Sequence, residues 1–198
     1  MGRAPVIVLT GGPGGGKSTL MRELRAEDPY AERWLLIPEA VPLLFQAGLD
    51  AREKSFQRVM VRLQVAREET CTDTARPGQV LVCHRGTLDP LAYWLRNGWD
   101  EGEFFFLTRM SRDEHFRRYC GVRHIQTTAI GAEAHYRRWP DAHRPETLVQ
   151  AAETDRLCAH AWGDHPHYVL IENANRDWPA KAHAAHDLLT HWIVPKDD

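Results

Sequence analysis

The stretch that decides the fold is VIVLTGGPGGGKSTLMREL, residues 6–24. Its apolar run over residues 6–9 is typical of a short buried strand. The glycine-rich run over residues 11–16 predicts a loop, because glycine favours turns over regular structure. From Ser18 onward the spacing of apolar residues predicts a helix. A strand, a glycine-rich loop and a helix therefore follow one another directly.

The spacing of Gly11, Gly16, Lys17 and Ser18 satisfies the P-loop pattern G-x-x-x-x-G-K-[ST]. We expect the loop glycines to allow φ > 0, so that consecutive N–H groups point inward around phosphate oxygens. The residues predicted to hold the phosphates are Gly11, Gly12, Pro13, Gly14, Gly15, Gly16, Lys17, Ser18 and Thr19. Positive φ is expected at Gly11, Gly14, Gly15 and Gly16. The pattern indicates a site for a nucleoside triphosphate.

Each polar residue of the pattern has an expected task. Lys17 would reach the β- and γ-phosphates, and the Ser18 hydroxyl would bind Mg²⁺. Thr19 would lie near the α-phosphate. The predicted cofactors are thus ATP, with GTP as an alternative, and Mg²⁺.

Length, charge and cysteine usage narrow the class of protein. A chain of 198 residues suits one α/β domain, residues 1–198. A net charge of −2 argues against a general nucleic-acid binder. The sequence has neither an apolar run of about 18 residues nor a signal-peptide pattern, which argues against a membrane protein or a secreted one. Four cysteines without paired spacing indicate reduced thiols and a cytoplasmic location.

Strand and helix patterns alternate along the chain. Further strands are expected over residues 33–40, at a run that stops at His84, over 122–127 and over 167–173. Helices are expected over residues 53–74 and 88–98, between residue 111 and the strand at 122, and over residues 144–162 and 181–192. Such alternation predicts a mainly parallel sheet with helices on both faces.

Functional residues are expected at the carboxyl ends of these strands. The residues predicted to meet there are Lys17, Glu39, His84, Arg85 and Asp89. Glu39 could accept the proton of an attacking hydroxyl or hold Mg²⁺ through water; alternatively it is only a helix-end acid. Arg85 could neutralise phosphoryl charge, or only pair with a carboxylate. Asp89 could bind a substrate hydroxyl or cap its helix.

Several short motifs carry a resemblance to a known family: TGGPGGGKST, PEA, HRGTLDPLAYW, RPET and AAETDRL. Over about its full length the chain resembles the small P-loop "AAA domain" family of ATP/GTP-binding proteins. Members of that family look more like the ribosylnicotinamide kinase domain of NadR and the deoxynucleoside and thymidylate kinases than like ring-forming ATPases. The resemblance implies a five-stranded P-loop NTPase sheet of order 2-3-1-4-5.

One position departs from the family pattern. The third strand of the family ends in Asp-Arg-Gly, and the resemblance gives that aspartate a contact to Mg²⁺; here His84 takes its place. A neutral imidazole is a poor Mg²⁺ ligand compared with oxygen. Either Glu39 serves the metal's outer shell instead, or catalysis is weakened.

The resemblance also implies a helical, arginine-rich lid, at about residues 130–147. Its predicted phosphate ligands are Arg137, Arg138 and above all Arg144, with an exposed basic face as the alternative. RPET places Glu146 in the first turn of a helix. The histidines of HAWGDHPHY fit no zinc spacing. Of Tyr93 and Trp94, which face opposite sides of a helix, at most one can line a pocket, and Phe104, Phe105 and Phe106 are expected in the core.

Together these patterns predict a kinase that transfers the γ-phosphoryl group of Mg·ATP to a small acceptor: a nucleoside, a nucleotide or a similar alcohol. Lys17, Glu39, Arg85 and Arg144 are its predicted catalytic residues. Glu39, His84, Arg85 and Asp89 are the predicted substrate contacts. The alternative is a regulatory ATP- or GTP-binding module that hydrolyses slowly and acts on a protein partner. The guanine signature Asn-Lys-x-Asp is absent from the sequence, which favours ATP.

Overall fold

The computed structural model of the chain describes residues 3–26, 28–137, 146–173 and 177–193. Its centre is a parallel sheet of five strands in the order β2-β3-β1-β4-β5, which confirms the predicted order. The strands are β1 (Val6–Thr10), β2 (Trp34–Ile37), β3 (Val80–His84), β4 (Gly121–Ile125) and β5 (Tyr168–Ile171). Each lies within a residue or two of a predicted strand, although β2 is shorter because Pro38 cannot donate to a neighbouring strand.

The helices connect these strands. They are α1 (Lys17–Ala26), α2 (Val41–Gln46), α3 (Lys54–Thr74), α4 (Asp89–Arg96), α5 (Glu101–Thr108), α6 (Arg112–Phe116), α7 (Leu148–Trp162) and α8 (Trp178–Thr190), with short 3₁₀ turns η1 (Ala31–Arg33) and η2 (Glu133–His135). In the described part of the chain, no helix combines the length and apolar composition needed to cross a bilayer.

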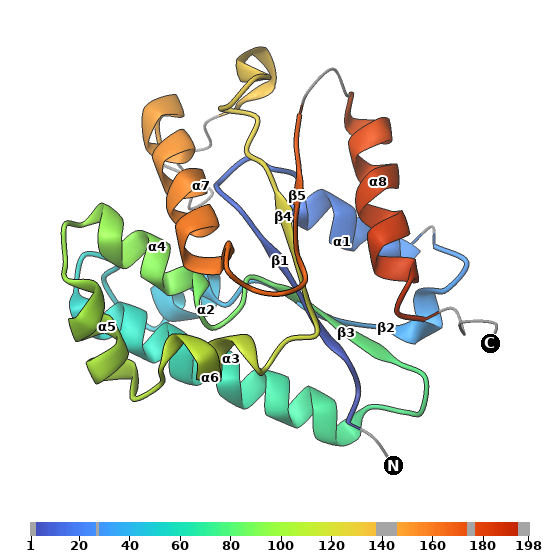
Figure 1. The fold of residues 1–198 in the computed structure, drawn as a ribbon, viewed down its shortest axis with the longest axis horizontal. Coiled ribbons are helices and arrows are strands. Elements are labelled where there is room, and N and C mark those ends of the chain that lie inside the picture. Colours follow the sequence, from blue (N-terminus) through green and yellow to red (C-terminus); the bar gives the residue numbers. More distant parts are fainter. Residues whose placement is uncertain (1–2, 27, 138–145, 174–176, 194–198) are drawn as a thin grey trace.

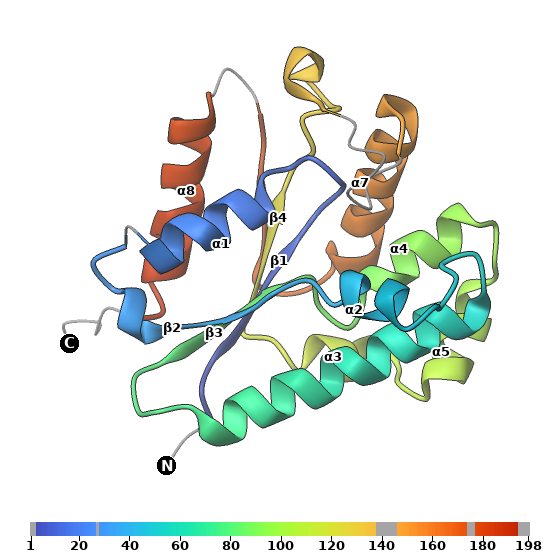
Figure 2. The same cartoon turned by 180° about the vertical axis from the view of Figure 1, so that it is seen from behind.

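The sheet separates two hydrophobic cores. Alternate strand residues point to opposite faces: Val6 and Val8 pack with α3, α4 and α7, whereas Ile7 and Leu9 pack with α1 and α8. Figure 1 shows α8 and α1 on one side of the sheet and α3 to α7 on the other, and Figure 2 shows the same arrangement from behind. The buried strands therefore hold their carboxyl ends rigidly.

The register of the strands brings the predicted site residues to one edge. Leu9 pairs with His84, and Ile37 pairs with Cys83. The residues that follow β1, β2 and β3 consequently leave the sheet side by side. This placement follows from parallel pairing and needs no contact between the loops themselves.

Some elements differ from expectation. Helix α7 begins at Leu148 and not at residue 144, because Thr147 and Gln150 form a capping box there; Glu146 therefore precedes the helix. Helices α2 and α5 were not predicted. In α5, Phe104 is fully buried and Phe106 is 80% exposed, so the expectation that all three phenylalanines belong to the core was wrong for Phe106.

Candidate functional site

The loop between β1 and α1 lines a cavity of about 230 Å³. Gly11, Gly14 and Gly16 have φ of 116°, 79° and 102°, which side-chain-bearing residues rarely adopt. Gly15 does not have the positive φ that we expected. Its requirement for glycine is steric, because a Cβ would lie 2.4 Å from the carbonyl oxygen of Ile125. The loop thus has the tightly curved backbone of an anion-binding nest.

Lys17 lies under this loop. Its Nζ donates to the carbonyl oxygens of Gly11 at 2.7 Å and Gly12 at 2.8 Å, and the residue is 4% exposed. Burial, assisted by the charge of Arg85, lowers the pKa of Lys17 to about 7. A large share of the lysine is therefore neutral near pH 7 in the free chain.

Two charged side chains from the last helices hold the loop from behind. Asp155 of α7 accepts hydrogen bonds from the backbone N–H groups of Gly12 at 2.7 Å and Thr127 at 2.9 Å. Lys181 of α8 donates to the carbonyl oxygen of Gly15 at 3.2 Å. The loop is therefore fixed to α7 and α8 as well as to its own strand and helix.

Sequence reasoning missed both of these residues. A signal was present for Asp155, since it falls among Ala151, Ala152, Cys158 and Ala161 on the buried face of α7. A charged residue on an otherwise apolar helix face requires a buried partner. The partners here are the backbone N–H groups of Gly12 and Thr127 and the ring of His124, whose Nε2 lies 3.1 Å from Asp155 Oδ1.

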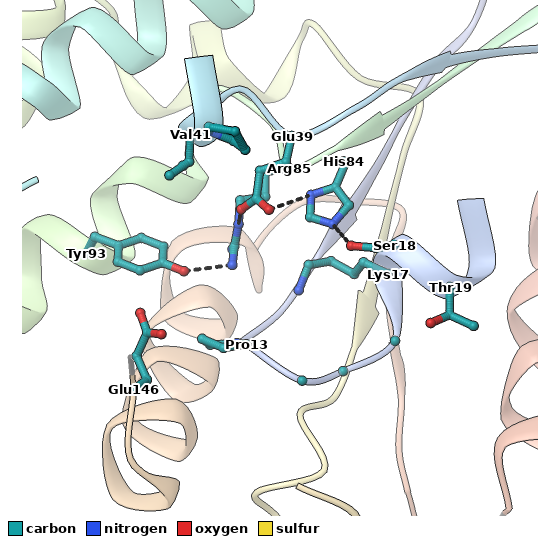
Figure 3. Close-up of a pocket in the computed structure, with 14 residues that line it drawn as sticks. Pro13, Lys17, Ser18, Thr19, Glu39, Val41, His84, Arg85, Tyr93 and Glu146 are labelled. Carbon is teal, nitrogen blue, oxygen red and sulfur yellow. Dashed lines mark hydrogen bonds and ion pairs between the residues drawn. The ribbon is translucent and has the colours of Figure 1, made fainter. Parts of the chain in front are cut away.

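Ser18, His84 and Glu39 form a row beside the loop (Figure 3). Ser18 Oγ lies 3.0 Å from His84 Nε2, and His84 Nδ1 lies 4.0 Å from Glu39 Oε2. Burial lowers the pKa of His84 to about 3, so the imidazole is neutral. Because the carboxylate can only accept, we assign the ring proton to Nδ1, which leaves Nε2 to accept from Ser18.

Glu39 stands just before α2, outside the helix, whose N-cap is Ala40. Its Oε1 accepts from Arg85 Nε at 3.2 Å. Burial acts to raise the pKa of Glu39, but His84, Arg85 and Lys17 together lower it to about 2. Glu39 is thus a carboxylate at any physiological pH.

Arg85 occupies the centre of the site with φ 71°, which is rare for a residue other than glycine. Its NH1 donates to Gly11 O at 3.2 Å and Asp89 Oδ1 at 3.1 Å, and its NH2 donates to the Tyr93 hydroxyl at 2.7 Å. Backbone strain of this kind persists only where the surroundings enforce it. The guanidinium is accordingly fixed between the loop and α4.

Asp89 is completely buried. Besides Arg85, it accepts from Thr10 Oγ1 at 2.8 Å, Gly86 N at 2.8 Å and Trp162 Nε1 at 3.1 Å. These donors occupy both carboxylate oxygens. Asp89 therefore holds Arg85 in place, and its contact with a substrate hydroxyl stays a prediction.

A second cavity, of about 400 Å³, opens beside the first and shares Glu39, Arg85 and Tyr93 with it. Apolar side chains from α2, α3 and α4 form much of its wall: Val41, Phe45, Phe56, Met60 and Pro90. Tyr93 lines both cavities, whereas its neighbour Trp94 is 1% exposed in the core, as the helical spacing predicted.

Two amides of α3 supply polar atoms to this apolar cavity. Gln57 is 4% exposed and lines the cavity. Gln64 Nε2 donates to Glu68 Oε1 at 2.8 Å and Arg85 O at 3.1 Å. Gln64 also lines the cavity.

Glu146 lines both cavities from the segment before α7 and lies 3.5 Å from Arg96 NH1. Arg138 and Arg144 of the predicted lid fall outside the described residues, and Arg137 is exposed. Among the residues that the structure describes, no three His, Cys, Asp or Glu side chains are grouped so that they could hold a metal ion.

Solved structures resemble this fold. The NadR protein in complex with NR superposes with a TM-score of 0.67 at 14% identity, over 98% of this chain and 53% of that chain. This chain thus spans about half the length of the NadR chain. Deoxyadenosine kinase from M. mycoides superposes with a TM-score of 0.60 at 14% identity, over 94% and 99% of the two chains. No curated protein matches the sequence. Residues 6–181 match the family described as an AAA domain, and the chain belongs to that family.

Proposed function

We propose that this chain transfers the γ-phosphoryl group of ATP to a hydroxyl group of a small acceptor molecule. The observation that carries the proposal is that the loop cavity and the apolar cavity meet at Glu39 and Arg85. Phosphoryl transfer requires the acceptor oxygen to approach the γ-phosphorus in line with the bond to the leaving oxygen. Two adjoining cavities with a carboxylate and a guanidinium at their junction suit that requirement.

The cations of the site would neutralise the transferring group. Lys17 and Arg85 would act on the phosphate oxygens, together with the lid arginine Arg144. A Mg²⁺ ion bound with ATP would shield phosphate charge. The donor set of the chain fits this ion only in part, because Ser18 offers an oxygen whereas His84 offers a nitrogen.

Glu39 would orient the acceptor hydroxyl and take its proton. A carboxyl with a pKa of about 2 is a weak base, but a loose transition state needs little deprotonation before the phosphoryl group arrives. Triphosphate charge beside Lys17 and Arg85 would also offset the cations that lower the pKa of Glu39. Its basicity would therefore rise when the donor is bound.

The acceptor cavity favours an uncharged molecule with a ring. Its arginines are already paired: Arg96 with Glu146 and Arg52 with Asp50. The ring centroids of Phe45 and Phe56 lie 5.6 Å apart in its wall, and the Gln57 amide has an NH₂ group that can donate and an oxygen that can accept at the edge of a ring. These features favour a nucleoside or a similar ring-bearing alcohol over a nucleotide as the acceptor.

The test is a screen of nucleosides, nucleotides, sugars and other alcohols with ATP, read by mass spectrometry as the gain of one phosphoryl group. We expect a neutral ring-bearing alcohol to be phosphorylated, and Lys17→Ala to abolish the product. Triphosphate hydrolysis without any phosphorylated acceptor would contradict the proposal.

The second candidate is a regulatory ATP- or GTP-binding module with slow hydrolysis, here called a switch. His84 favours it, because a poor Mg²⁺ ligand at this position weakens catalysis. A switch would not need the apolar cavity beside the phosphates. Filling that cavity by Met60→Trp should therefore abolish phosphoryl transfer in a kinase but leave the hydrolysis rate of a switch unchanged.

A further inference from the structure

Ser18 and His84 direct polar atoms at one another at the edge of the phosphate cavity, and both also line an adjoining groove of about 340 Å³. The distance from Ser18 Oγ to His84 Nε2 is 3.0 Å. Neighbouring ligands of an octahedral cation, each about 2.1 Å from the ion, are separated by about 3.0 Å. The spacing that serves a hydrogen bond in the chain alone thus also suits two ligands of one cation.

The other ring nitrogen of His84 strengthens this interpretation. Nδ1 is buried and has no hydrogen-bond partner in the described part of the chain, and it faces Glu39 Oε2 at 4.0 Å. Histidines that bind metals usually direct their second N–H at a carboxylate, which fixes the tautomer and raises the basicity of the ligating nitrogen. Glu39 stands where such a carboxylate is needed.

The donor chemistry selects the kind of ion. Mg²⁺ prefers oxygen ligands, whereas imidazole suits first-row transition metals. The two protein atoms, one oxygen and one nitrogen, are too few to hold an ion alone. The remaining ligands must come from the phosphates of a bound nucleotide and from water.

We propose that Ser18 Oγ and His84 Nε2 are both direct ligands of the cation that accompanies the nucleotide, and that this site prefers a transition-metal ion such as Co²⁺ or Mn²⁺ to Mg²⁺. This rests on the proposed function, since a triphosphate supplies the other ligands. Binding of the ion replaces the hydrogen bond between the two side chains. The departure from the family's aspartate is then a change of metal preference and not a loss of the metal.

The direct test is pulsed EPR of Mn²⁺ bound to the full chain with the β,γ-methylene analogue of ATP, which places no nitrogen in the triphosphate. We expect a nitrogen coupling from a directly bound imidazole. Protein labelled with ¹⁵N-histidine should shift that coupling to ¹⁵N frequencies, which separates the imidazole from the adenine ring. A spectrum without histidine coupling would overturn the proposal, and this measurement needs no variant.

Variants test the preference itself. Calorimetry of the nucleotide complex should give a ratio of Co²⁺ to Mg²⁺ affinity that falls at least tenfold in His84→Asp. The exposed His191 provides a matched control, because His191→Asp makes the same chemical change far from the loop and should leave the ratio unchanged. An equal ratio in His84→Asp and the wild type would count against direct coordination.

Failure of the two proposals can be told apart. If the nucleotide analogue binds with EDTA present but no histidine coupling appears with Mn²⁺, only the cation proposal fails. If the analogue does not bind with or without a metal ion, the proposed phosphoryl transfer fails as well.

Discussion

At the scale of single residues, the charge of Lys17 should change most when a nucleotide binds. Burial lowers its pKa from 10.5 to about 7 in the free chain. Phosphate oxygens favour the ammonium form, so the pKa in the complex should return toward its ordinary value. Binding between pH 7 and pH 10 must then take up a proton, and affinity should fall up to about tenfold per pH unit as pH rises through that window.

Proton uptake is measured by titrating ATP at pH 8 in buffers of different ionisation enthalpy. The apparent binding enthalpy should vary with the buffer for the wild type. Lys17→Ala is the control: we expect it to fold, to bind ATP far more weakly and to lose the buffer dependence. Unchanged ATP affinity in Lys17→Ala would show that this lysine does not bind the phosphates.

A change at Glu39 should affect the rate of phosphoryl transfer without affecting ATP binding. Glu39→Gln keeps the shape and an oxygen for Arg85 Nε, but it cannot take a proton. We expect turnover to fall by about 10²-fold, the usual scale of general base catalysis, with ATP affinity retained. Steady-state kinetics with a phosphorylated acceptor would measure this, and unchanged turnover would reduce Glu39 to an anchor for Arg85.

The convergence of Lys17, Glu39, His84 and Arg85 could be predicted because each follows a parallel strand or sits in a motif of fixed geometry. The positive φ of Arg85 and the four donors around Asp89 could not. Two of the donors, Thr10 and Trp162, are distant from Asp89 in sequence and leave no local pattern. Sequence thus predicts which residues meet, but not how their hydrogen bonds are divided.

At the scale of elements, α8 should influence nucleotide binding through Lys181. Its Nζ also donates to Asn173 Oδ1 at 2.7 Å and to Gln126 O at 2.5 Å, so one charge joins the exits of β4 and β5 to the loop. A cation on the Gly15 carbonyl also polarises the peptide that carries the Gly16 N–H. We expect Lys181→Met to weaken ATP binding about tenfold.

The matched control for this prediction is Lys54→Met on α3, where the lysine pairs with Glu103 away from the loop. Calorimetry and denaturant unfolding should be run on both variants. Lower ATP affinity in Lys181→Met with its stability retained would indicate an effect on the loop. Equal affinity in both variants would show that α8 only covers the sheet.

The elements themselves were predictable to different degrees. All five strands could be predicted because each appears as a short apolar run between turn residues, whether it is buried throughout like β1, β3 and β4 or partly exposed like β2 and β5. Helix α5 could not be predicted. The apolar residues of EGEFFFLT follow one another without the spacing of an amphipathic helix, so the segment resembles a strand as much as a helix. The start of α7 was visible in the T-x-x-Q spacing of Thr147 and Gln150, a capping box that the RPET motif obscured.

At the scale of the whole molecule, buried neutral histidines should make the fold sensitive to acid. Burial lowers the pKa of His84 to about 3 and of His115 to about 4. Below pH 6.5 the unfolded chain protonates these groups and the folded chain does not, so unfolding takes up protons. The contribution of the two neutral histidines to the free energy of unfolding is complete above pH 6.5. It is lost as the pH falls toward 4 for His115 and toward 3 for His84.

Each of the two histidines should lower the free energy of unfolding by about 1.4 kcal/mol per pH unit across its window. Glu39 acts in the same direction at lower pH, because its folded pKa of about 2 lies below its ordinary value of 4.5. Denaturant unfolding between pH 4 and pH 8 measures the combined slope. His115→Gln should reduce this slope by the amount that one proton contributes. His191→Gln, at an exposed position, should leave the slope unchanged. A free energy of unfolding that stays constant from pH 6.5 to pH 4.5 would mean that water reaches His84 and His115. The assignment of a neutral imidazole to His84, on which the hydrogen bond from Ser18 depends, would then be wrong.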